Sequence, residues 1–269
     1  MLKWIDILNL DDELKKKVID LAQKDKVNLL SLADKCNSGN FSCLKFKSDL
    51  VRLAVAAFCL NDTKEQYDRL GISDNIFVDT MSDINIWCEN NNNRGLKNIG
   101  WIKNHLSCEI FRLGRLQFQL YECKNPTLNY SKLPFKFGDR LIYIHIPQGE
   151  RLDLSSCIES IKKANVFFKQ FFPDFEYKYY FCESWLLYEN NKDFMTESSN
   201  IIQFMSLFDI AYSIHYENQA IERIFGKKHR NINKYPESTT LQKNTKSYLQ
   251  NGGKLGLGIG YIDKQKYEL

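Results

Sequence analysis

Apolar residues recur at helical spacing through the first part of the chain, up to about residue 106. In segments 14–22, 27–36, 48–60, 76–88 and 99–106 they stand three or four positions apart, which is the spacing of one helix face. Acidic residues precede the first of these segments, where the helix dipole favours negative charge. We therefore expect residues 1–106 to form a helical N-terminal domain.

The period of the hydrophobic pattern changes after Ser107. Residues 110–121 predict a strand with one polar face, because apolar and polar side chains alternate from Leu116 onward, and Gly114 within the segment indicates a bulge. Residues 140–146 and 177–188 are apolar on both faces, as in strands at the centre of a sheet. An amphipathic helix is predicted between these two strands, over residues 154–171.

The last part of the chain continues the mixture of strands and helices. Aromatic and β-branched residues predict a strand over 201–216, and a glycine-rich strand over 254–262 follows two short helical segments. This order of elements predicts an α/β (α+β) fold, in which the helical N-terminal domain packs on a mixed β-sheet with flanking helices. The second domain is expected to span residues 107–269.

Composition and charge are those of a globular protein with a substantial core. Of the 269 residues, 43% are hydrophobic and 13% are aromatic. The net charge of +4 is small for this length and argues against nucleic acid as a partner, because nucleic-acid-binding proteins carry a concentrated basic face. The basic run at 227–230 lacks aromatic residues for base stacking, so we interpret it as a solvated loop. The pattern gives no indication of the oligomeric state.

The eight cysteines are scattered along the chain and form no C-x-x-C pair. Zinc sites need closely paired thiolates or histidines, so we expect no metal site. No apolar stretch is long enough to span a bilayer and no secretory signal is recognisable, so we expect no membrane association. These features predict a cytoplasmic protein with reduced thiols.

Polar side chains interrupt the two interior strands, where an unpaired polar group is costly. His145 lies near the end of the first strand, and Glu183 and Ser184 lie in the second. An imidazole suits a general base near neutral pH, and a carboxylate in an apolar strand should have a raised pKa that suits the same role. The alternatives are structural: His145 as a bonded core histidine, or Glu183 as the ion-pair partner of Arg112 or Arg115.

Several blocks of the sequence occur together in an order that resembles a known family. They are Asn98-Ile99-Gly100-Trp101-Ile102, the runs 109–118 and 182–187, His145-Ile146-Pro147 with Gly149, Phe171-Phe172-Pro173, Ser199-Asn200-Ile201 and Gly252-Gly253. Over about residues 70–261 the chain resembles bacterial acyltransferase-domain proteins. Members of this family join a helical N-terminal domain to a GNAT-like (N-acetyltransferase-like) C-terminal domain.

The resemblance implies a sheet whose two central strands, here 140–147 and 177–188, separate to admit the pantetheine arm of an acyl-CoA. Acetyl-CoA is one candidate, and its pyrophosphate would meet the turn after the first strand. The residues assigned to cofactor binding are Ile146, Gln148, Gly149 and Arg151.

The implied reaction is direct attack by an amine or hydroxyl of a small-molecule acceptor on the thioester. His145 or Glu183 would take the proton, and backbone N–H groups of the strands would stabilise the oxyanion. The candidate substrate-binding residues are Arg112, Arg115, Ser184 and Trp185.

The turn departs from the phosphate loop of typical GNAT enzymes, which carry Arg/Gln-x-x-Gly-x-Gly/Ala. Here Gly149 is its only glycine, and Glu150 and Asp153 bring negative charge that Arg151 offsets in part. The alternative to an acyltransferase is therefore a non-catalytic GNAT-like module that binds a ligand or a protein. Binding of acyl-CoA would distinguish the two.

Overall fold

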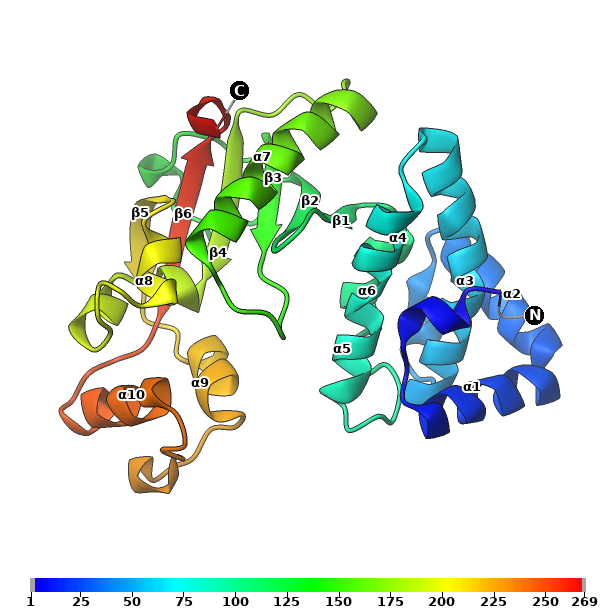
Figure 1. Cartoon of the computed structure of the whole chain (residues 1–269), viewed down its shortest axis with the longest axis horizontal. Coiled ribbons are helices and arrows are strands. Elements are labelled where there is room, and N and C mark those ends of the chain that lie inside the picture. Colours follow the sequence, from blue (N-terminus) through cyan, green and yellow to red (C-terminus); the bar gives the residue numbers. More distant parts are fainter. Residues whose placement is uncertain (1–2, 268–269) are drawn as a thin grey trace. The chain divides into compact units, whose positions relative to one another are not determined.

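The computed structural model describes residues 3–267 (Figure 1). The chain divides into two compact units, which are described separately below. The first unit holds the chain up to Leu120 together with residues 146–150 and 166–173. The second unit holds residues 121–145 and 151–165 and the chain from Asp174 onward.

The first unit consists mainly of helices. They are α1 (Asp12–Lys24), α2 (Lys26–Asn37), α3 (Asp49–Leu70), α4 (Asp74–Met81), α5 (Asp83–Glu89) and α6 (Ile99–Leu106), with short 3₁₀ helices η1 (Ile5–Leu8) and η2 (Phe41–Leu44). Every residue of α3 from Leu53 to Leu60 is buried, so this helix forms the core of the unit. Ser48 caps its first turn by accepting a hydrogen bond from the N–H of Val51 (3.3 Å).

The single helix predicted over 76–88 is in fact two helices, because the helix is interrupted at Ser82. The Ser82 hydroxyl donates to the carbonyl of Asp79 (2.6 Å), while the Ser82 carbonyl accepts from the N–H groups of Asn85 (3.1 Å) and Ile86 (3.5 Å). Local side-chain hydrogen bonds of this kind compete with a continuous helix. The other helices predicted before residue 106 are present.

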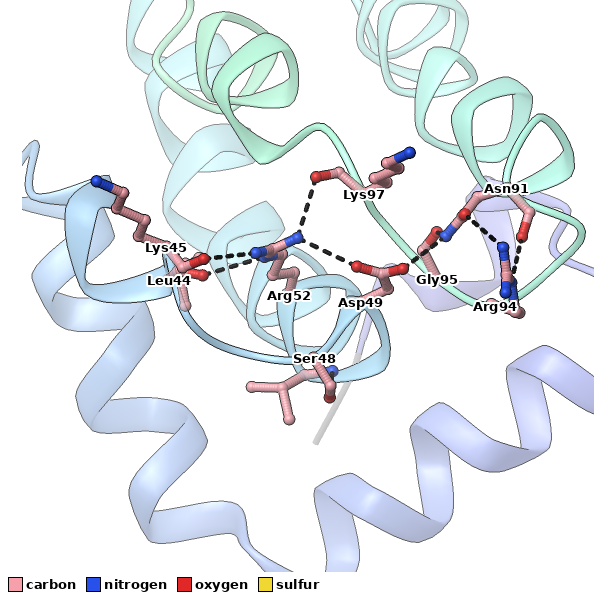
Figure 2. A network of polar contacts seen from close by, with 10 residues as sticks. Leu44, Lys45, Ser48, Asp49, Arg52, Asn91, Arg94, Gly95 and Lys97 are labelled. Carbon is pink, nitrogen blue, oxygen red and sulfur yellow. Dashed lines mark hydrogen bonds and ion pairs between the residues drawn. The ribbon is translucent and has the colours of Figure 1, made fainter. Parts of the chain in front are cut away.

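A polar network holds the loop after α5 against the N-terminus of α3 (Figure 2). Arg52 pairs with Asp49 (3.1 Å) and donates to three backbone carbonyls from two other segments: Leu44 (3.0 Å), Lys45 (2.7 Å) and Lys97 (3.0 Å). The second carboxylate oxygen of Asp49 accepts from the side chain of Asn91 (2.9 Å). Gly95 has a φ of +108°, and a Cβ there would collide with the carbonyl of Asp49. The loop therefore needs glycine at this contact.

Helices α5 and α6 share a buried carboxylate. Asp83 accepts from the indole N–H groups of Trp87 (3.0 Å) and Trp101 (2.6 Å), and His105 Nε2 lies 3.2 Å from the same oxygen. Burial by itself raises the pKa of Asp83, but the hydrogen bond and charge of His105 with the two indole hydrogen bonds lower it overall. Trp101, which belongs to the block 98–102 of the family resemblance, thus has a structural role in the first unit.

The strands form a six-stranded mixed sheet in the described chain, in the order β1-β2-β3-β4-β6-β5. They are β1 (Ile110–Arg112), β2 (Gln117–Glu122), β3 (Arg140–His145), β4 (Tyr179–Ser184), β5 (Asp209–Ile214) and β6 (Leu257–Asp263). β3 and β4 pair in parallel, whereas β1 with β2, β4 with β6 and β5 with β6 pair antiparallel. The predicted α/β class and the central position of β3 and β4 are confirmed.

Two strand predictions need correction. Residues 110–121 form an antiparallel hairpin of β1 and β2, not one strand, because Gly114 (φ +85°) turns the chain. Residues 201–205 of the predicted strand 201–216 belong to helix α8 (Asn200–Met205), which Ser199 caps, and the strand itself is only β5. A short apolar run does not distinguish a buried helix from a strand.

The strands of the second unit bury both faces of their sheet. On one face Tyr180 donates to Asn165 (2.6 Å) of α7 (Leu154–Phe171), the predicted amphipathic helix. On the other face Phe181 and Ile259 pack in an aromatic cluster, called here the aromatic face. Its other members are Cys123, Leu128, Phe135 and Leu141, with Tyr121, Tyr130, Leu133, Tyr143, Tyr179, Tyr212 and Tyr261 packed against them.

Two further helices, α9 (Asn218–Phe225) and α10 (Thr240–Gln250), lie between β5 and β6, as predicted. The glycines of β6 permit close packing: a Cβ at Gly258 would collide with the carbonyl of Leu187 in the 3₁₀ helix η4 (Trp185–Leu187). Over residues 3–267, no helix is long and apolar enough to cross a bilayer.

Candidate active site

Backbone pairing between the two central strands stops before the predicted catalytic residues. The ladder joins Ile142 to Tyr180 and Tyr143 to Phe181, although β3 continues to His145 and β4 to Ser184. Two residues further along β4, the Glu183 carbonyl lies 3.5 Å from the hydroxyl of Tyr143, a side chain and not a backbone partner. The predicted separation of the strands is therefore confirmed on the side of His145 and Glu183.

Alternation along the strands places His145 and Glu183 on the aromatic face. Tyr143 and Phe181 meet there edge to face, with ring centroids 4.9 Å apart. His145 and Glu183 each follow one of these residues by two positions, so they project from the same face. The His145 ring stacks on Tyr143 at 4.2 Å, which orients the half-buried imidazole.

The Glu183 carboxylate is half-buried, and burial raises its pKa. Within the described part of the second unit, no hydrogen bond or opposite charge lowers this pKa. Burial also raises the pKa of Tyr121, Tyr143 and Tyr212, and the negative charge of Glu183 adds to that effect. A carboxylate among three phenols with no ion-pair partner is a group that can take and hold a proton.

Two buried arginines hold the turn after β3, within the first unit. Arg112 forms an ion pair with Glu150 and donates to Ser82 (3.3 Å). Arg115 donates to two backbone carbonyls of the turn, those of Pro147 (3.0 Å) and Glu150 (2.9 Å). The negative charge of Glu150 is thus offset by Arg112, a pairing across 38 residues that the sequence did not reveal.

The predicted cofactor-binding residues of this turn differ in exposure. Ile146 is half-buried, while Gln148 and Gly149 are exposed. Gly149 has a φ of +106°, and the space that a Cβ would occupy is open. The Gln148 side chain accepts from Asn90 (3.2 Å), in the loop that the Arg52 network holds. Asn90 was not singled out from the sequence. The run of asparagines at 90–93 was the available signal, because asparagine tolerates the positive φ that residues 92 and 93 adopt in this turn.

The start of α7, in the second unit, carries the remaining charged residues. Arg151 is exposed, and Asp153 accepts hydrogen bonds from the hydroxyl of Ser155 (2.6 Å) and the N–H of Ser156 (3.3 Å). These hydrogen bonds, with the charge of Arg151, lower the pKa of Asp153. Asp153 is therefore the N-cap of α7.

Ser184 and Trp185 shape the chain where β4 ends. The predicted strand over 177–188 stops at Ser184, whose hydroxyl accepts from the N–H of Leu186 (3.2 Å) and starts η4. The N–H of Trp185 donates to the side chain of Gln219 (2.7 Å). Both residues are buried, so these contacts account for their positions, and substrate binding by either residue stays a prediction. Among the residues from 3 to 267, no group of three or more histidine, cysteine or acidic side chains is arranged to hold a metal ion.

Two family models match this chain. Residues 110–262 match the GNAT-like C-terminal domain, and residues 5–108 match the N-acyltransferase N-terminal domain. No curated protein matches the sequence.

Solved acyltransferase structures share the fold. A complex with decanoyl-CoA and teicoplanin and a mutant in complex with octanoyl-CoA each align with a TM-score of 0.79 at 18% identity, covering 96% of this chain and 86% of theirs. A complex with decanoyl-CoA aligns with a TM-score of 0.78 at the same identity, covering 96% of this chain and 85% of that one. The two domain matches show that the chain belongs to the N-acyltransferase family that joins these N-terminal and GNAT-like C-terminal domains.

Proposed function

We propose that this acyltransferase moves an acyl group from an acyl-CoA to an amine or hydroxyl of a small molecule. The observation that carries the proposal is the half-buried carboxylate of Glu183, whose pKa burial raises, beside the point where β3 and β4 stop pairing. Similar acyltransferases were solved with octanoyl-CoA, decanoyl-CoA and teicoplanin, so these compounds and acetyl-CoA are the first ones to test.

The cofactor pyrophosphate is proposed to bind the turn at Ile146, Gln148, Gly149 and Arg151, through backbone N–H groups and the side chains of Gln148 and Arg151. Two features support this assignment: the open space above Gly149, and the neutralisation of Glu150 by Arg112. Backbone N–H groups in a turn that admits close approach are ordinary phosphate ligands.

Arg112 and Arg115 contact the turn through their guanidinium groups, so we assign them a positioning role in cofactor binding. Contact of either arginine with the acceptor, which the sequence suggested, remains the alternative. The two roles differ in which affinity the arginines control, that for acyl-CoA or that for the acceptor.

In the proposed reaction the acceptor nitrogen or oxygen attacks the thioester carbonyl carbon. The carbonyl π electrons move to oxygen, where strand N–H groups stabilise the charge, and the C–S bond breaks when the carbonyl re-forms. Glu183 takes the proton of the acceptor, and that proton is then available to the departing thiolate of CoA. His145, stacked on Tyr143, is the second candidate for this base.

The proposal is tested first by binding. Acetyl-CoA, octanoyl-CoA, decanoyl-CoA and free CoA are titrated by calorimetry and by thermal unfolding, where a ligand at 100 times its Kd adds about 2.7 kcal/mol of stability. Transfer to teicoplanin and to a panel of amines and alcohols is then followed by mass spectrometry. Failure of every acyl-CoA to bind would refute the proposal and favour the alternative, a non-catalytic GNAT-like module that binds another ligand or a protein.

We also propose that the helical domain, residues 1–106, and the GNAT-like domain, residues 107–269, are the functional division of the chain. The first compact unit also contains β1, and Phe111 of β1 packs on Tyr67 of α3 with ring centroids 5.7 Å apart. We therefore expect that limited proteolysis does not release a stable fragment that starts between residues 90 and 108. Release of such a fragment would refute this expectation.

A further inference from the structure

Three of the cysteines lie together in the first unit. Cys36 is in α2, Cys43 in η2 and Cys59 in α3. The Sγ atoms of Cys36 and Cys43 are 3.8 Å apart. Cys59 interacts with Cys36 from the other helix, through a side-chain hydrogen bond that lowers the pKa of Cys36. The proposed acyl transfer uses none of these thiols.

The members of this group differ in access to solvent. Cys36 and Cys59 are buried, whereas Cys43 is half-exposed. An accessible thiol therefore lies beside a buried thiol whose pKa is lowered, and burial raises the pKa of Cys43 itself. Peroxide reacts with the thiolate form, so the raised pKa of Cys43 slows this first step, which the exposure of Cys43 permits. The Cys36 thiolate then serves the second step, the attack that forms the disulfide.

The segment between the two cysteines can accommodate a shorter sulfur–sulfur distance. A disulfide has an S–S length of about 2.05 Å, so the sulfurs must approach. Residues 37–40 are exposed, and Gly39 (φ +88°) has nothing within 4 Å of a Cβ position. Arg52 holds the carbonyls of Leu44 and Lys45, directly after Cys43 (Figure 2). The adjustment therefore falls on residues 37–42, where it must bend hydrogen bonds such as those that the N–H groups of Gly39 and Asn40 donate to the carbonyls of Cys36 (2.8 Å) and Lys35 (2.9 Å).

We propose that Cys36 and Cys43 form a reversible disulfide and are a redox modification site of this protein. With hydrogen peroxide as oxidant, the Cys43 thiol is oxidised to a sulfenic acid and one water is released. The Cys36 thiolate attacks the Cys43 sulfur, the S–S bond forms, and the hydroxide that leaves takes a proton to become a second water. Two thiols and one peroxide thus give one disulfide and two waters, and a dithiol such as dithiothreitol reverses the change.

Peptide mapping tests the proposal directly, because trypsin cleaves after Lys35 and Lys45 and leaves both cysteines on one peptide. The folded protein is treated with increasing peroxide, denatured, alkylated with N-ethylmaleimide and digested. We expect the peptide 36–45 to lose both alkyl groups and two hydrogens, while the peptides with the buried thiols of Cys88, Cys157 and Cys182 remain alkylated. Dithiothreitol before alkylation should restore both labels.

Three controls keep the result interpretable. In the Cys43→Ser variant the disulfide form of this peptide should be lost, and in Cys59→Ser it should still form, because Cys59 is neither of the two sulfurs that join. In urea the same oxidation should slow, since the fold no longer brings the sulfurs together. Three outcomes would overturn the proposal. The disulfide could form equally fast in urea, or peptide 36–45 could stay fully alkylated while other thiols oxidise. The third is a cross-link to the Cys59 peptide 53–64 in place of the internal disulfide.

Discussion

Glu183→Gln should make this protein a poorer enzyme and a more stable one. Glutamine keeps the shape of the side chain but cannot take a proton from the acceptor. A positioned general base contributes about 100-fold or more to turnover, or about 2.7 kcal/mol of barrier, so turnover should fall by at least that factor. Affinity for acyl-CoA should stay nearly unchanged, because the proposed cofactor contacts lie in the turn after β3.

The gain in stability follows from the raised pKa of Glu183. The folded state holds the proton more tightly than the unfolded state, so the free energy of unfolding falls as pH rises from the ordinary glutamate pKa through the folded one. Above the folded pKa the full cost of burying the charged carboxylate is present. Each tenfold difference between the acid dissociation constants of Glu183 in the folded and unfolded states corresponds to about 1.4 kcal/mol of that cost. Glutamine has no charge to desolvate. The variant should therefore be more stable than the wild type at about pH 8, and the difference should shrink towards about pH 4.

Two measurements check this reasoning. CoA release with a saturating acceptor is followed by chromatography across pH, where the wild-type rate should rise through the pKa of Glu183 and the variant should lack that inflection. Urea unfolding is measured at about pH 4 and about pH 8, with Glu159→Gln as a control at an exposed position on α7. Full activity of the variant would refute the catalytic assignment. A variant less stable at the higher pH would show that the carboxylate makes a stabilising contact.

Three further changes test other parts of the site. His145→Ala should lower turnover less than Glu183→Gln does and should leave acyl-CoA affinity unchanged. If His145→Ala lowers turnover more than Glu183→Gln, His145 is the base. Arg112→Ala should weaken acyl-CoA binding about ten-fold, since it removes the ion-pair partner of Glu150, and adding Glu150→Gln should recover part of the lost affinity. Calorimetry measures the Kd of each variant, and an unchanged Kd in Arg112→Ala would contradict the positioning role. Gly258→Ala should destabilise the fold by roughly 3 kcal/mol, because the added Cβ collides with backbone of η4, and an unchanged Tm would contradict that packing.

The sequence by itself determined the elements whose pattern is local. The helices before residue 106, except for the break between α4 and α5, the helix α7 and the two central strands follow from the spacing of apolar residues, because that spacing decides which faces can be buried. The same reasoning singled out His145 and Glu183, since a polar side chain in an apolar strand is costly without a partner or a use. The raised pKa of Glu183, expected from its place in the sequence, agrees with the structure.

Only the tertiary structure decided which residues meet. The turn at Gly114 depends on a positive φ, and the choice of helix for residues 200–205 depends on what surrounds a short apolar run. The acidic turn after β3 looked unsuited to a phosphate until Arg112, far away in the sequence, proved to neutralise Glu150. Three scattered cysteines likewise meet on α2, η2 and α3. Hydrophobic periodicity specifies the buried face of each element but not its partner, because partners are set by packing between elements distant in the chain.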